Sequence, residues 1–335
     1  MRIIHHQRLP HEGQFSIERL FAGMRTCLPL DWNVAVAQSP HPSKGLLPRL
    51  RNLLDARRQE GDIHHIVGDA HYLSFALPRE KTILTIHDCA NLNRLGGLKR
   101  TIFKYLWYIG PMRRAAVVTT ISETARKELE RWVGPMARRV VVIPNCVRSE
   151  FVASPKPFNE AAPVVLQVGV GWNKNLERVA QALVGTHCVL DIIGKPSDVQ
   201  LARLEESGVR YRVLGRVSDE ELVEAYRRCD LVVFTSIYEG FGLPILEAQA
   251  TGRPVITSNR SSMPEAAGEG ALLVNPDSID EIRAAVVCLC SDNVLRESLV
   301  SKGFENVAKY RPDAIAARYA EIYASLAAAR LPARP

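Results

Sequence analysis

The stretch Glu239-Gly240-Phe241-Gly242-Leu243-Pro244-Ile245-Leu246-Glu247 decides the fold around it. It follows an apolar run, Leu231 to Phe234, that is typical of a buried parallel strand. Its glycines allow the backbone to approach a ligand closely, and Pro244 suits the first turn of a helix. Gly252 marks the end of that helix, and Pro254-Val255-Ile256 begins the next strand. The stretch therefore predicts two carboxylates beside a helix N-terminus, an arrangement that suits phosphate together with the hydroxyls of a sugar or ribose.

The same alternation of strand and helix extends in both directions along the chain. Each half repeats a βαβα pattern, which predicts an α/β fold with a parallel sheet in each half. The proline-rich segment 155–159 has the character of a linker, and we place the domain boundary there. In parallel sheets of this kind, ligands bind outside the carboxyl ends of the strands. We therefore expect two domains, each with its ligand-binding edge at the strand ends.

The composition is that of a globular protein with an uneven distribution of charge. Hydrophobic residues make up 47% and charged residues 24% of the 335 residues. The sequence has no apolar run long enough to span a bilayer and no pattern of a signal peptide at its start. The seven cysteines lack a zinc spacing, and we expect reduced thiols in a cytoplasm. The net charge of +7 is concentrated in the first half, since residues 1–150 alone carry +10.

Two segments of the basic half combine apolar and cationic residues. Lys44 to Arg58 predicts a helix with five leucines on one face and arginines around them, and Leu98 to Arg114 mixes bulky aromatics with Lys and Arg. Such segments can lie on an anionic membrane, which attracts basic residues near its surface. They can equally pack their apolar faces on the sheet of the first domain. The charge of this half favours membrane contact, and no nucleic-acid-binding motif accompanies it.

Several motifs, taken in order, resemble those of a known enzyme family. They are Thr85-Ile86-His87-Asp88, Ile121-Ser122-Glu123, Val142-Ile143-Pro144-Asn145, Val168-Gly169 with Lys174-Asn175, Gly215 with Ser218-Asp219-Glu220-Glu221, the Glu-x7-Glu pair Glu239 and Glu247, and Ser262-Met263-Pro264-Glu265. Together they resemble the retaining glycosyltransferases of the GT-B type, in particular the GT4 family (glycosyl transferases group 1). The similarity is dense from about residue 82 to 310 and thin before that.

The resemblance implies a GT-B fold, in which two Rossmann-like domains with parallel sheets face each other across a cleft. Residues 1–153 would form the acceptor-side domain, and residues 160–311 the domain that binds a nucleotide-sugar donor. Residues 312–335 would form a C-terminal helix that crosses back to the first domain.

The resemblance also assigns the donor-binding residues. Glu239 would bind the sugar hydroxyls, together with the backbone of Gly240, Phe241, Gly242 and Leu243, and Glu247 would hold the ribose. Lys174 would neutralise the donor diphosphate beside Gly169 and Gly215. Many relatives carry an arginine directly after the glycine, where this chain has Val170, so that either Lys174 acts alone or Arg178 or Arg216 substitutes.

Within the acceptor-side domain, the resemblance assigns three residues. His87 would contact the donor sugar near its reacting centre, and Asp88 would orient His87 or bind the acceptor. Gly13 would belong to the N-terminal glycine loop that approaches the donor. The implied catalytic residues are therefore His87, Glu239 and Lys174.

The function that the resemblance implies is transfer of a sugar from a nucleotide-diphosphate sugar to a glycan or lipid-linked acceptor in polysaccharide biosynthesis. The donor is a substrate; we expect no cofactor and no metal, because no Asp-x-Asp motif follows a predicted strand. The expected location is the cytoplasm, peripherally on the inner face of the membrane. Two alternatives remain. Gly169-Val170-Gly171 also suits an NAD-dependent oxidoreductase, although Lys174 replaces the third glycine of that fingerprint, and a non-catalytic nucleotide-sugar-binding protein would keep the same site.

Overall fold

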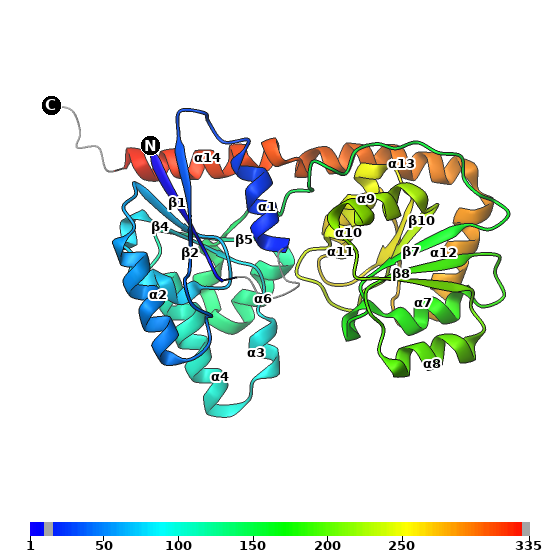
Figure 1. Cartoon of the computed structure of the whole chain (residues 1–335), viewed down its shortest axis with the longest axis horizontal. Coiled ribbons are helices and arrows are strands. Elements are labelled where there is room, and N and C mark those ends of the chain that lie inside the picture. The colour runs from blue at the N-terminus through cyan, green and yellow to red at the C-terminus, as the bar shows by residue number, and fades with distance from the viewer. Residues whose placement is uncertain (10–15, 330–335) are drawn as a thin grey trace. The chain divides into compact units, whose positions relative to one another are not determined.

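The computed structural model describes residues 1–9 and 16–329 and divides the chain into two units. The first unit comprises Met1–Cys146 together with Pro312–Pro335, and the second comprises Val147–Arg311. Within the described residues each unit has one six-stranded sheet, and the strands of both sheets pair in parallel. Helices cover both faces of each sheet (Figure 1). The structure thus has the α/β, doubly wound organisation that the alternating pattern predicts.

The first unit is built around strands in the order β2-β1-β3-β4-β5-β6. These strands are β1 (Arg2–Gln7), β2 (Asn33–Gln38), β3 (Ile63–Ile66), β4 (Thr82–Ile86), β5 (Val117–Thr120) and β6 (Val141–Val142). Its α-helices are α1 (Ser16–Arg25), α2 (Leu46–Arg58), α3 (Ala90–Arg94), α4 (Gly97–Lys104), α5 (Gly110–Arg113), α6 (Glu123–Val133) and α14 (Pro312–Ala328). A π-helical turn, η3 (Tyr105–Ile109), joins α4 to α5, and short 3₁₀ turns occupy η1 (His71–Phe75), η2 (Arg79–Lys81) and η4 (Gly134–Arg139).

The second unit has strands in the order β12-β11-β10-β7-β8-β9. They are β7 (Val164–Val168), β8 (Val189–Ile193), β9 (Tyr211–Gly215), β10 (Leu231–Phe234), β11 (Val255–Ser258) and β12 (Leu272–Val274). Its helices are α7 (Leu176–Leu183), α8 (Asp198–Ser207), α9 (Asp219–Arg228), α10 (Leu243–Thr251), α11 (Met263–Ala267), α12 (Ile279–Ser291) and α13 (Asn293–Val307), with 3₁₀ turns η5 (Trp172–Lys174) and η6 (Ala308–Tyr310). β10 is buried along its whole length because helices cover both faces of the sheet, which explains its unbroken apolar sequence.

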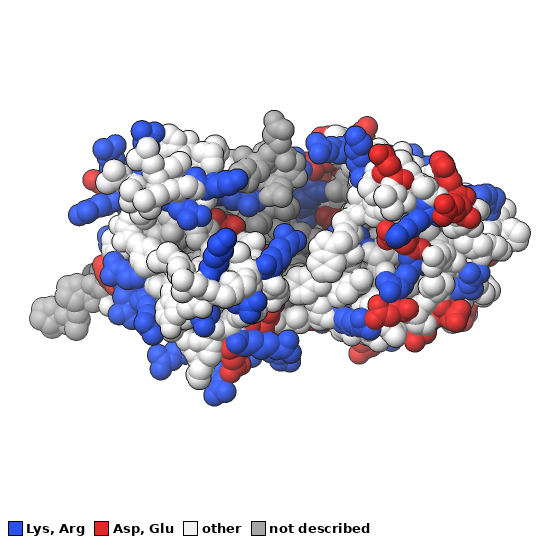
Figure 2. Space-filling model, turned by 90° about the horizontal axis from the view of Figure 1, so that it is seen from below, with Lys and Arg blue, Asp and Glu red and all other residues white. Residues whose placement is uncertain are grey.

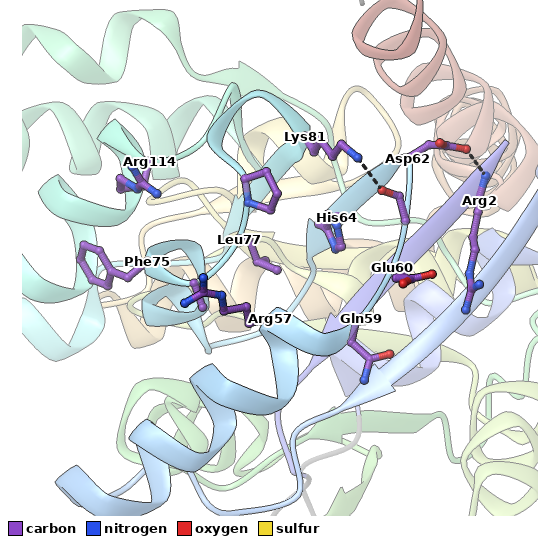
Figure 3. Close-up of a pocket in the computed structure, with 13 residues that line it drawn as sticks. Arg2, Arg57, Gln59, Glu60, Asp62, His64, Phe75, Leu77, Lys81 and Arg114 are labelled. Carbon is purple, nitrogen blue, oxygen red and sulfur yellow. Dashed lines mark hydrogen bonds between the residues drawn. The ribbon is translucent and has the colours of Figure 1, made fainter.

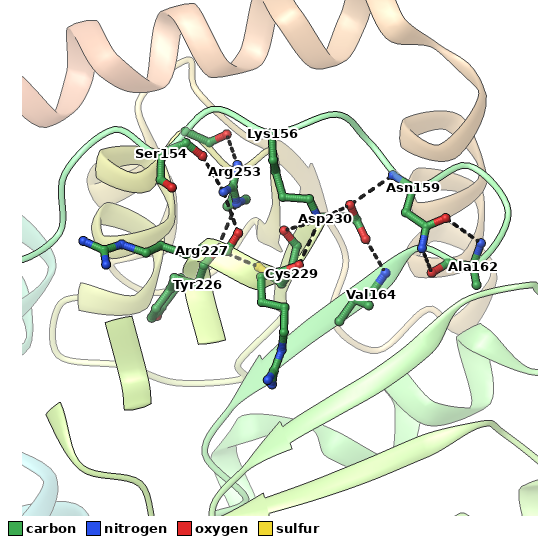
Figure 4. A network of polar contacts seen from close by, with 12 residues as sticks. Ser154, Lys156, Asn159, Ala162, Val164, Tyr226, Arg227, Cys229, Asp230 and Arg253 are labelled. Atoms are coloured by element: carbon green, nitrogen blue, oxygen red, sulfur yellow. Dashed lines mark hydrogen bonds and ion pairs between the residues drawn. The ribbon is translucent and has the colours of Figure 1, made fainter. Parts of the chain in front are cut away.

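The proline-rich segment 155–159 belongs to the second unit, and the division lies earlier, after Cys146. Lys156 Nζ contacts Oδ1 of the buried Asp230 at 2.5 Å, and the backbone N–H groups of Asn159 and Val164 donate to the same carboxylate (Figure 4). The Arg253 guanidinium adds a 2.6 Å bond to the carbonyl of Ser154. A segment that sequence composition marks as a linker is therefore fixed to one unit by buried polar contacts.

The last helix, α14, packs on the first unit although it follows the second in the chain. The Tyr323 hydroxyl lies 3.0 Å from His5 Nε2 and 2.7 Å from His65 Nδ1, and both histidines are fully buried in neighbouring strands. The other ring nitrogen of His65 bonds Thr85 Oγ1 at 2.7 Å. Burial lowers the pKa of His5 to about 3, so the layer beneath α14 is neutral at physiological pH. No helix in the described ranges is long and apolar enough to cross a bilayer.

We predict that Tyr323→Phe destabilises the first unit by about 1–3 kcal/mol, because two buried histidine nitrogens lose a hydrogen-bond partner. Tyr319→Phe is the matched control, since its hydroxyl lies 3.4 Å from Thr85 Oγ1 and contributes a weaker bond. Chemical denaturation of both variants and of the wild type gives the free energy of unfolding. If the two units unfold in separate transitions, each transition is fitted by itself. Equal stabilities of Tyr323→Phe and the wild type would show that the hydroxyl contributes nothing.

Candidate functional site

The strand order of the second unit brings two loops together at one point of the sheet. β7 lies between β8 and β10, so the chain leaves β7 toward one edge and later leaves β10 toward the other. A crevice outside the carboxyl ends of the strands forms at such a reversal, and ligands of doubly wound sheets bind there. The loop after β7 holds Gly169 and Lys174, and the loop after β10 holds Glu239. The topology therefore places three predicted donor-site residues at one location.

Lys174 and Glu239 form a direct ion pair. Lys174 Nζ lies 2.6 Å from Glu239 Oε1, and the side chains are only 21% and 16% exposed. The ammonium group also lies 4.6 Å from the centre of the Phe234 ring. A pair with so little solvent around it is screened weakly, which fixes both charges in position. The structure thus joins the two residues that the sequence assigned separately to phosphate and to sugar.

Gly169 provides the space that the Lys174 side chain occupies. Its φ is +90°, and a Cβ at this position would lie 3.0–3.3 Å from three carbons of the Lys174 side chain. Any larger residue would displace the lysine stem as well as strain the backbone. The glycine thus controls the position of the cation, a role that the sequence alone did not indicate.

The loop after β7 is locked by two asparagines that sequence analysis did not assign to the site. Asn173 Nδ2 donates to Glu239 Oε1 at 3.0 Å and to the carbonyl of Tyr238 at 2.9 Å. Asn175, left-handed at φ 61°, donates from Nδ2 to the carbonyls of Thr235 and Pro276. Both side chains join the loops after β7 and β10. The Lys174-Asn175 motif in the sequence indicated this loop, but the spacing of its residues does not show which groups the asparagine amides will bond.

The two candidate replacements for an arginine near Val170 differ in their surroundings. Arg178 Nη1 donates to Asn175 Oδ1 at 3.0 Å, and Nη2 lies 3.6 Å from Asp277 Oδ1. Arg216 is exposed and directly follows Gly215 at the end of β9. The carbonyl of Gly215 accepts from the N–H of Gly194, at the ends of neighbouring strands. Arg216 is therefore the candidate whose position at a strand end suits a second cation.

The backbone around Glu239 is held by a serine pair. The Oγ atoms of Ser261 and Ser262 donate to the carbonyl of Glu239 at 2.7 and 2.9 Å. The N–H of Glu239 in turn donates to Ser261 Oγ at 3.3 Å. These serines precede α11, and sequence analysis gave the neighbouring motif no role beyond the resemblance. They fix the backbone from which the Glu239 carboxylate extends.

α10 begins at the point that the opening stretch predicts. Gly242 precedes it with φ +118°, a conformation that only glycine adopts without strain, and Pro244 occupies the first turn. Phe241 is buried against Tyr310, at 5.8 Å between ring centres. Gly240 and Leu243 complete the loop and the helix start. The partial positive charge of the helix N-terminus lies directly after Glu239 in the chain.

Glu247 is a buried carboxylate rather than a solvated helix residue. It is 7% exposed, and its Oε2 accepts a 2.8 Å hydrogen bond from the hydroxyl of Tyr226 in α9. Burial raises the pKa of Glu247, and the tyrosine hydrogen bond opposes this rise. Tyr226 had no recognisable signal in the sequence, because it comes from a helix of ordinary amphipathic pattern. A buried carboxylate with one tyrosine partner keeps oxygen lone pairs available for ligand hydroxyls.

In the first unit, His87 directly follows β4 and is 9% exposed. Its Nε2 lies 2.9 Å from the carbonyl of Val67, which can only accept, so Nε2 carries the proton. Burial lowers the pKa of His87, which leaves the ring neutral with a lone pair on Nδ1. Asp88 is exposed, and its carbonyl accepts from the Tyr108 hydroxyl at 3.1 Å. Gly13 lies outside the described residues.

Two pockets in the described part of the chain lie away from these residues. A pocket of about 840 Å³ in the first unit is lined by side chains near the amino ends of β1, β3 and β4, including Arg2, Asp62, His64 and Lys81 (Figure 3). A second, of about 540 Å³, lies next to the Asp230 contacts of the second unit. Neither contains a residue that the sequence predicted for the site. Pocket size therefore does not identify the functional edge of either sheet.

Comparison with known proteins agrees with this geometry. Residues 149–306 match the family described as "Glycosyl transferases group 1", and residues 25–151 match "Glycosyltransferase Family 4". The two matches together span most of the chain and include Lys174, Glu239 and Glu247. The chain belongs to the GT4 glycosyltransferases. Its two parallel-sheet units are those of the GT-B fold, as the resemblance implied.

Several curated relatives of this glycosyltransferase are mannosyltransferases. It is 28% identical over 274 residues to O-antigen chain mannosyltransferase B of Escherichia coli, covering 72% of this chain and 70% of that protein. It is 28% identical over 257 residues to the serotype-specific mannosyltransferase WbdA of Escherichia coli, covering 69% of this chain but 32% of WbdA. The chain thus spans about a third of the length of WbdA.

Solved structures with the same fold include Anabaena Alr3699/HepE in complex with UDP. The TM-score is 0.77 at 18% identity, over 97% of this chain and all of that one. A glycosyltransferase from Rickettsia africae gives a TM-score of 0.74 at 17% identity, over 97% and 98% of the chains. At these identities the similarity establishes the fold alone.

We predict that Glu247→Gln raises the thermal stability of the glycosyltransferase above neutral pH. In the folded state the pKa of Glu247 is raised above its ordinary value of 4.5, so Glu247 loses its proton at a lower pH in the unfolded chain than in the folded one. The stability of the wild type therefore falls as the pH rises from the unfolded pKa toward the folded pKa. Glutamine removes that loss and keeps an acceptor for Tyr226. Tm measured from about pH 4 to pH 8 should show a difference that grows with pH. A variant that is less stable than the wild type at every pH would contradict this assignment of the buried charge.

Proposed function

We propose that this glycosyltransferase transfers a mannosyl group, with retention of configuration, from a nucleotide-diphosphate sugar to a glycan or lipid-linked acceptor in polysaccharide biosynthesis. The observation that carries the proposal is the Lys174–Glu239 pair at the strand-order reversal, with Glu247 buried one helical turn into α10, which follows. The named mannosyltransferase relatives supply the choice of sugar.

In this proposal each end of the opening stretch binds a different part of the donor. Glu239 accepts hydrogen bonds from sugar hydroxyls, and the N–H groups of the Gly240–Leu243 turn donate to the same ligand. Glu247 accepts from the ribose hydroxyls, which are neutral and so suit a carboxylate in a desolvated position. The two carboxylates thereby determine the orientation of the donor, and the diphosphate would lie between them.

Lys174 and the N-terminus of α10 would stabilise the leaving group. Negative charge grows on the diphosphate oxygen as the glycosidic bond breaks, so a fixed cation stabilises the transition state more than the ground state. Arg216, at the end of β9, is the candidate for a second cation. This arrangement performs the charge neutralisation that a divalent metal would otherwise supply, and we propose a metal-independent reaction without a cofactor.

Retention would follow from a front-face reaction. The bond between the anomeric carbon and the diphosphate oxygen breaks, and both its electrons go to the diphosphate. The acceptor oxygen then bonds the same face of the anomeric carbon, and its proton passes to the departing diphosphate oxygen. His87, neutral and with Nδ1 as an acceptor, would hold a donor-sugar hydroxyl near the reacting centre, and Asp88 would contact the acceptor.

The location that suits this chemistry is the cytoplasm, peripherally on the inner face of the membrane, where a lipid-linked glycan is accessible. The proposal includes no nucleic-acid partner. The alternative of an NAD-dependent oxidoreductase is not favoured, because the position of the third fingerprint glycine holds Lys174, whose side chain folds over Gly169. A non-catalytic binding protein would keep the donor site but show no turnover.

We predict that wild-type protein is stabilised in a thermal-shift panel by one class of nucleotide sugar among UDP-, GDP-, ADP- and TDP-linked donors.

Lys174→Ala should lower kcat/KM by about 10²–10³-fold, because it removes a transition-state charge contact. Lys302→Ala, which removes an exposed lysine paired with Glu269, is the matched control and should retain full activity. Absence of any donor-induced shift in the wild type would refute the donor site, and binding without turnover would favour the non-catalytic alternative.

We also predict that removal of divalent metals leaves the reaction rate unchanged. The expectation rests on Lys174 and the helix N-terminus as the groups that stabilise the diphosphate. Initial rates with the preferred donor, before and after dialysis against EDTA, provide the measurement. A loss of activity that Mg²⁺ or Mn²⁺ restores would overturn the metal-independent mechanism while leaving the donor assignment intact.

A further inference from the structure

The exposed face of α2 is apolar where a packed helix would be polar. Leu46, Leu47, Leu50 and Leu54 are 76, 59, 46 and 59% exposed. Four of the five leucines that the sequence places on one helical face are thus exposed, whereas Leu53 packs against the hydrophobic core of the unit. The interpretation that this face packs on the sheet is therefore wrong for these four. Burial of leucine is strongly favoured in water, and four exposed leucines within nine residues form an apolar patch.

The buried side of α2 makes both apolar and polar contacts with the fold, since Ala56 and Leu53 pack in the hydrophobic core of the unit. Asn52 is 1% exposed, and its side chain donates to the carbonyl of His41 and to the Tyr72 hydroxyl while accepting from the N–H of His41. Ala56 is the other fully buried residue of the helix. The orientation of α2 is therefore fixed by an asparagine with three specific hydrogen bonds, and the helix cannot rotate to hide its leucines without breaking them.

A second segment exposes apolar residues in the same way. Leu98, Ile102, Tyr105 and Leu106 of α4 and η3 are 75, 50, 52 and 56% exposed. Its inner face is held by Phe103 and Trp107, whose rings stack at 5.4 Å between centres. As on α2, the exposed apolar residues lie on the side of the helix opposite to the residues that pack in the core. We name the two exposed faces together the α2–α4 surface, formed by Leu46, Leu47, Leu50, Leu54, Leu98, Ile102, Tyr105 and Leu106.

The two segments are neighbours in the first unit. The Arg49 guanidinium of α2 lies 4.9 Å from the centre of the Trp107 ring in η3 and 5.9 Å from that of Tyr72 in η1. Trp107 is fixed in turn by a 2.7 Å bond from its Nε1 to Asp69. α2 and α4 lie on the same side of the first unit (Figure 1). Arg49 thus joins the two faces into one surface.

The charge around this surface is of one sign. Lys44, Arg51, Arg57 and Arg58 are exposed on or beside α2, and Arg94, Lys99, Arg113 and Arg114 are exposed around α4 and α5. The sequence has no Asp or Glu between Asp88 and Glu123, and Asp55 is the single acidic residue from 44 to 58. Figure 2 shows lysines and arginines over this side of the first unit with few acidic residues among them.

From this combination we infer that the α2–α4 surface docks on an anionic lipid bilayer. The leucines, Ile102 and Tyr105 enter the boundary between headgroups and acyl chains, and the surrounding arginines and lysines contact lipid phosphates. Interfacial helices bind membranes by the sum of these two terms, buried apolar area and attraction to anionic lipid. Tyrosine suits this depth because its ring is apolar and its hydroxyl remains at the level of the headgroups.

A second copy of the chain fits the surface less well. Two α2–α4 surfaces brought together would oppose basic residues of like sign, since acidic residues are almost absent from both segments. An anionic bilayer complements the charge and covers the leucines at once. The inference rests on the first unit alone and not on the donor site, so either can fail without the other.

The test is sedimentation of the full chain with vesicles, comparing phosphatidylglycerol-containing with pure phosphatidylcholine membranes at low and high salt. We expect binding to the anionic vesicles, weakened by salt because Lys and Arg contacts are screened. Leu47→Gln/Leu50→Gln should lower the vesicle affinity at least about tenfold at both salt concentrations, because the apolar contribution does not depend on screening. Arg57→Gln/Arg58→Gln should weaken binding mainly at low salt.

The matched control is Leu30→Gln/Val36→Gln, which removes two exposed apolar residues of the same unit outside this surface. It should bind vesicles as the wild type does. Because all substituted side chains are exposed, every variant should keep the Tm of the wild type and its stabilisation by donor.

Three results would overturn the inference. They are absence of wild-type binding to anionic vesicles, unchanged binding of Leu47→Gln/Leu50→Gln, and a wild-type dimer in light scattering that this variant converts to a monomer. The last result would assign the surface to a second copy.

Discussion

The order of strands in the second unit is the constraint on which the site depends. β7 is central, and the chain builds β8 and β9 on one side of it before β10, β11 and β12 on the other. The connections that follow β7 and β10 therefore run toward opposite edges of the sheet. Lys174 and Glu239 meet at 2.6 Å in the crevice where these two connections begin. Asn173 and Asn175 connect the two loops, so the ion pair is held by backbone geometry as much as by its own attraction. Among the other predicted donor residues, Gly240, Phe241 and Gly242 precede α10, and Leu243 and Glu247 lie in its first turns.

Two buried carboxylates of the second unit differ in how their charge is compensated. Asp230, at the opposite end of β10, is fully buried but is satisfied by Lys156 and two backbone N–H groups, and it fixes the segment before β7. Glu247 has one tyrosine partner and a raised pKa. The first is a structural anchor. The second is a carboxylate kept desolvated at some cost to stability, which is the pattern expected of a residue retained for binding.

The first unit separates its polar and apolar groups in an unusual way. Its sheet is covered on one side by a layer of neutral histidines that bond the hydroxyl of Tyr323, and this layer attaches the last helix to the first strands. On α2, in contrast, Asn52, Leu53 and Ala56 make the internal contacts while four leucines are exposed. Apolar surface that could have been buried is thus presented to the surroundings, with basic residues around it.

The sequence by itself determined the α/β class, the strands on either side of the opening stretch and the start of α10 at Gly242 and Pro244, and it predicted the carboxylates and the lysine of the candidate donor site. It could do so because these features depend on local backbone conformation and on residue spacing. It did not determine that Lys174 pairs with Glu239, that Tyr226 bonds Glu247, or that the segment 155–159 is fixed to the second unit. These are contacts between residues far apart in the chain, and strand order decides them. Nor could it decide whether the leucines of α2 face the sheet or the solvent, because periodicity identifies an apolar face but only the packing of Asn52 fixes its direction.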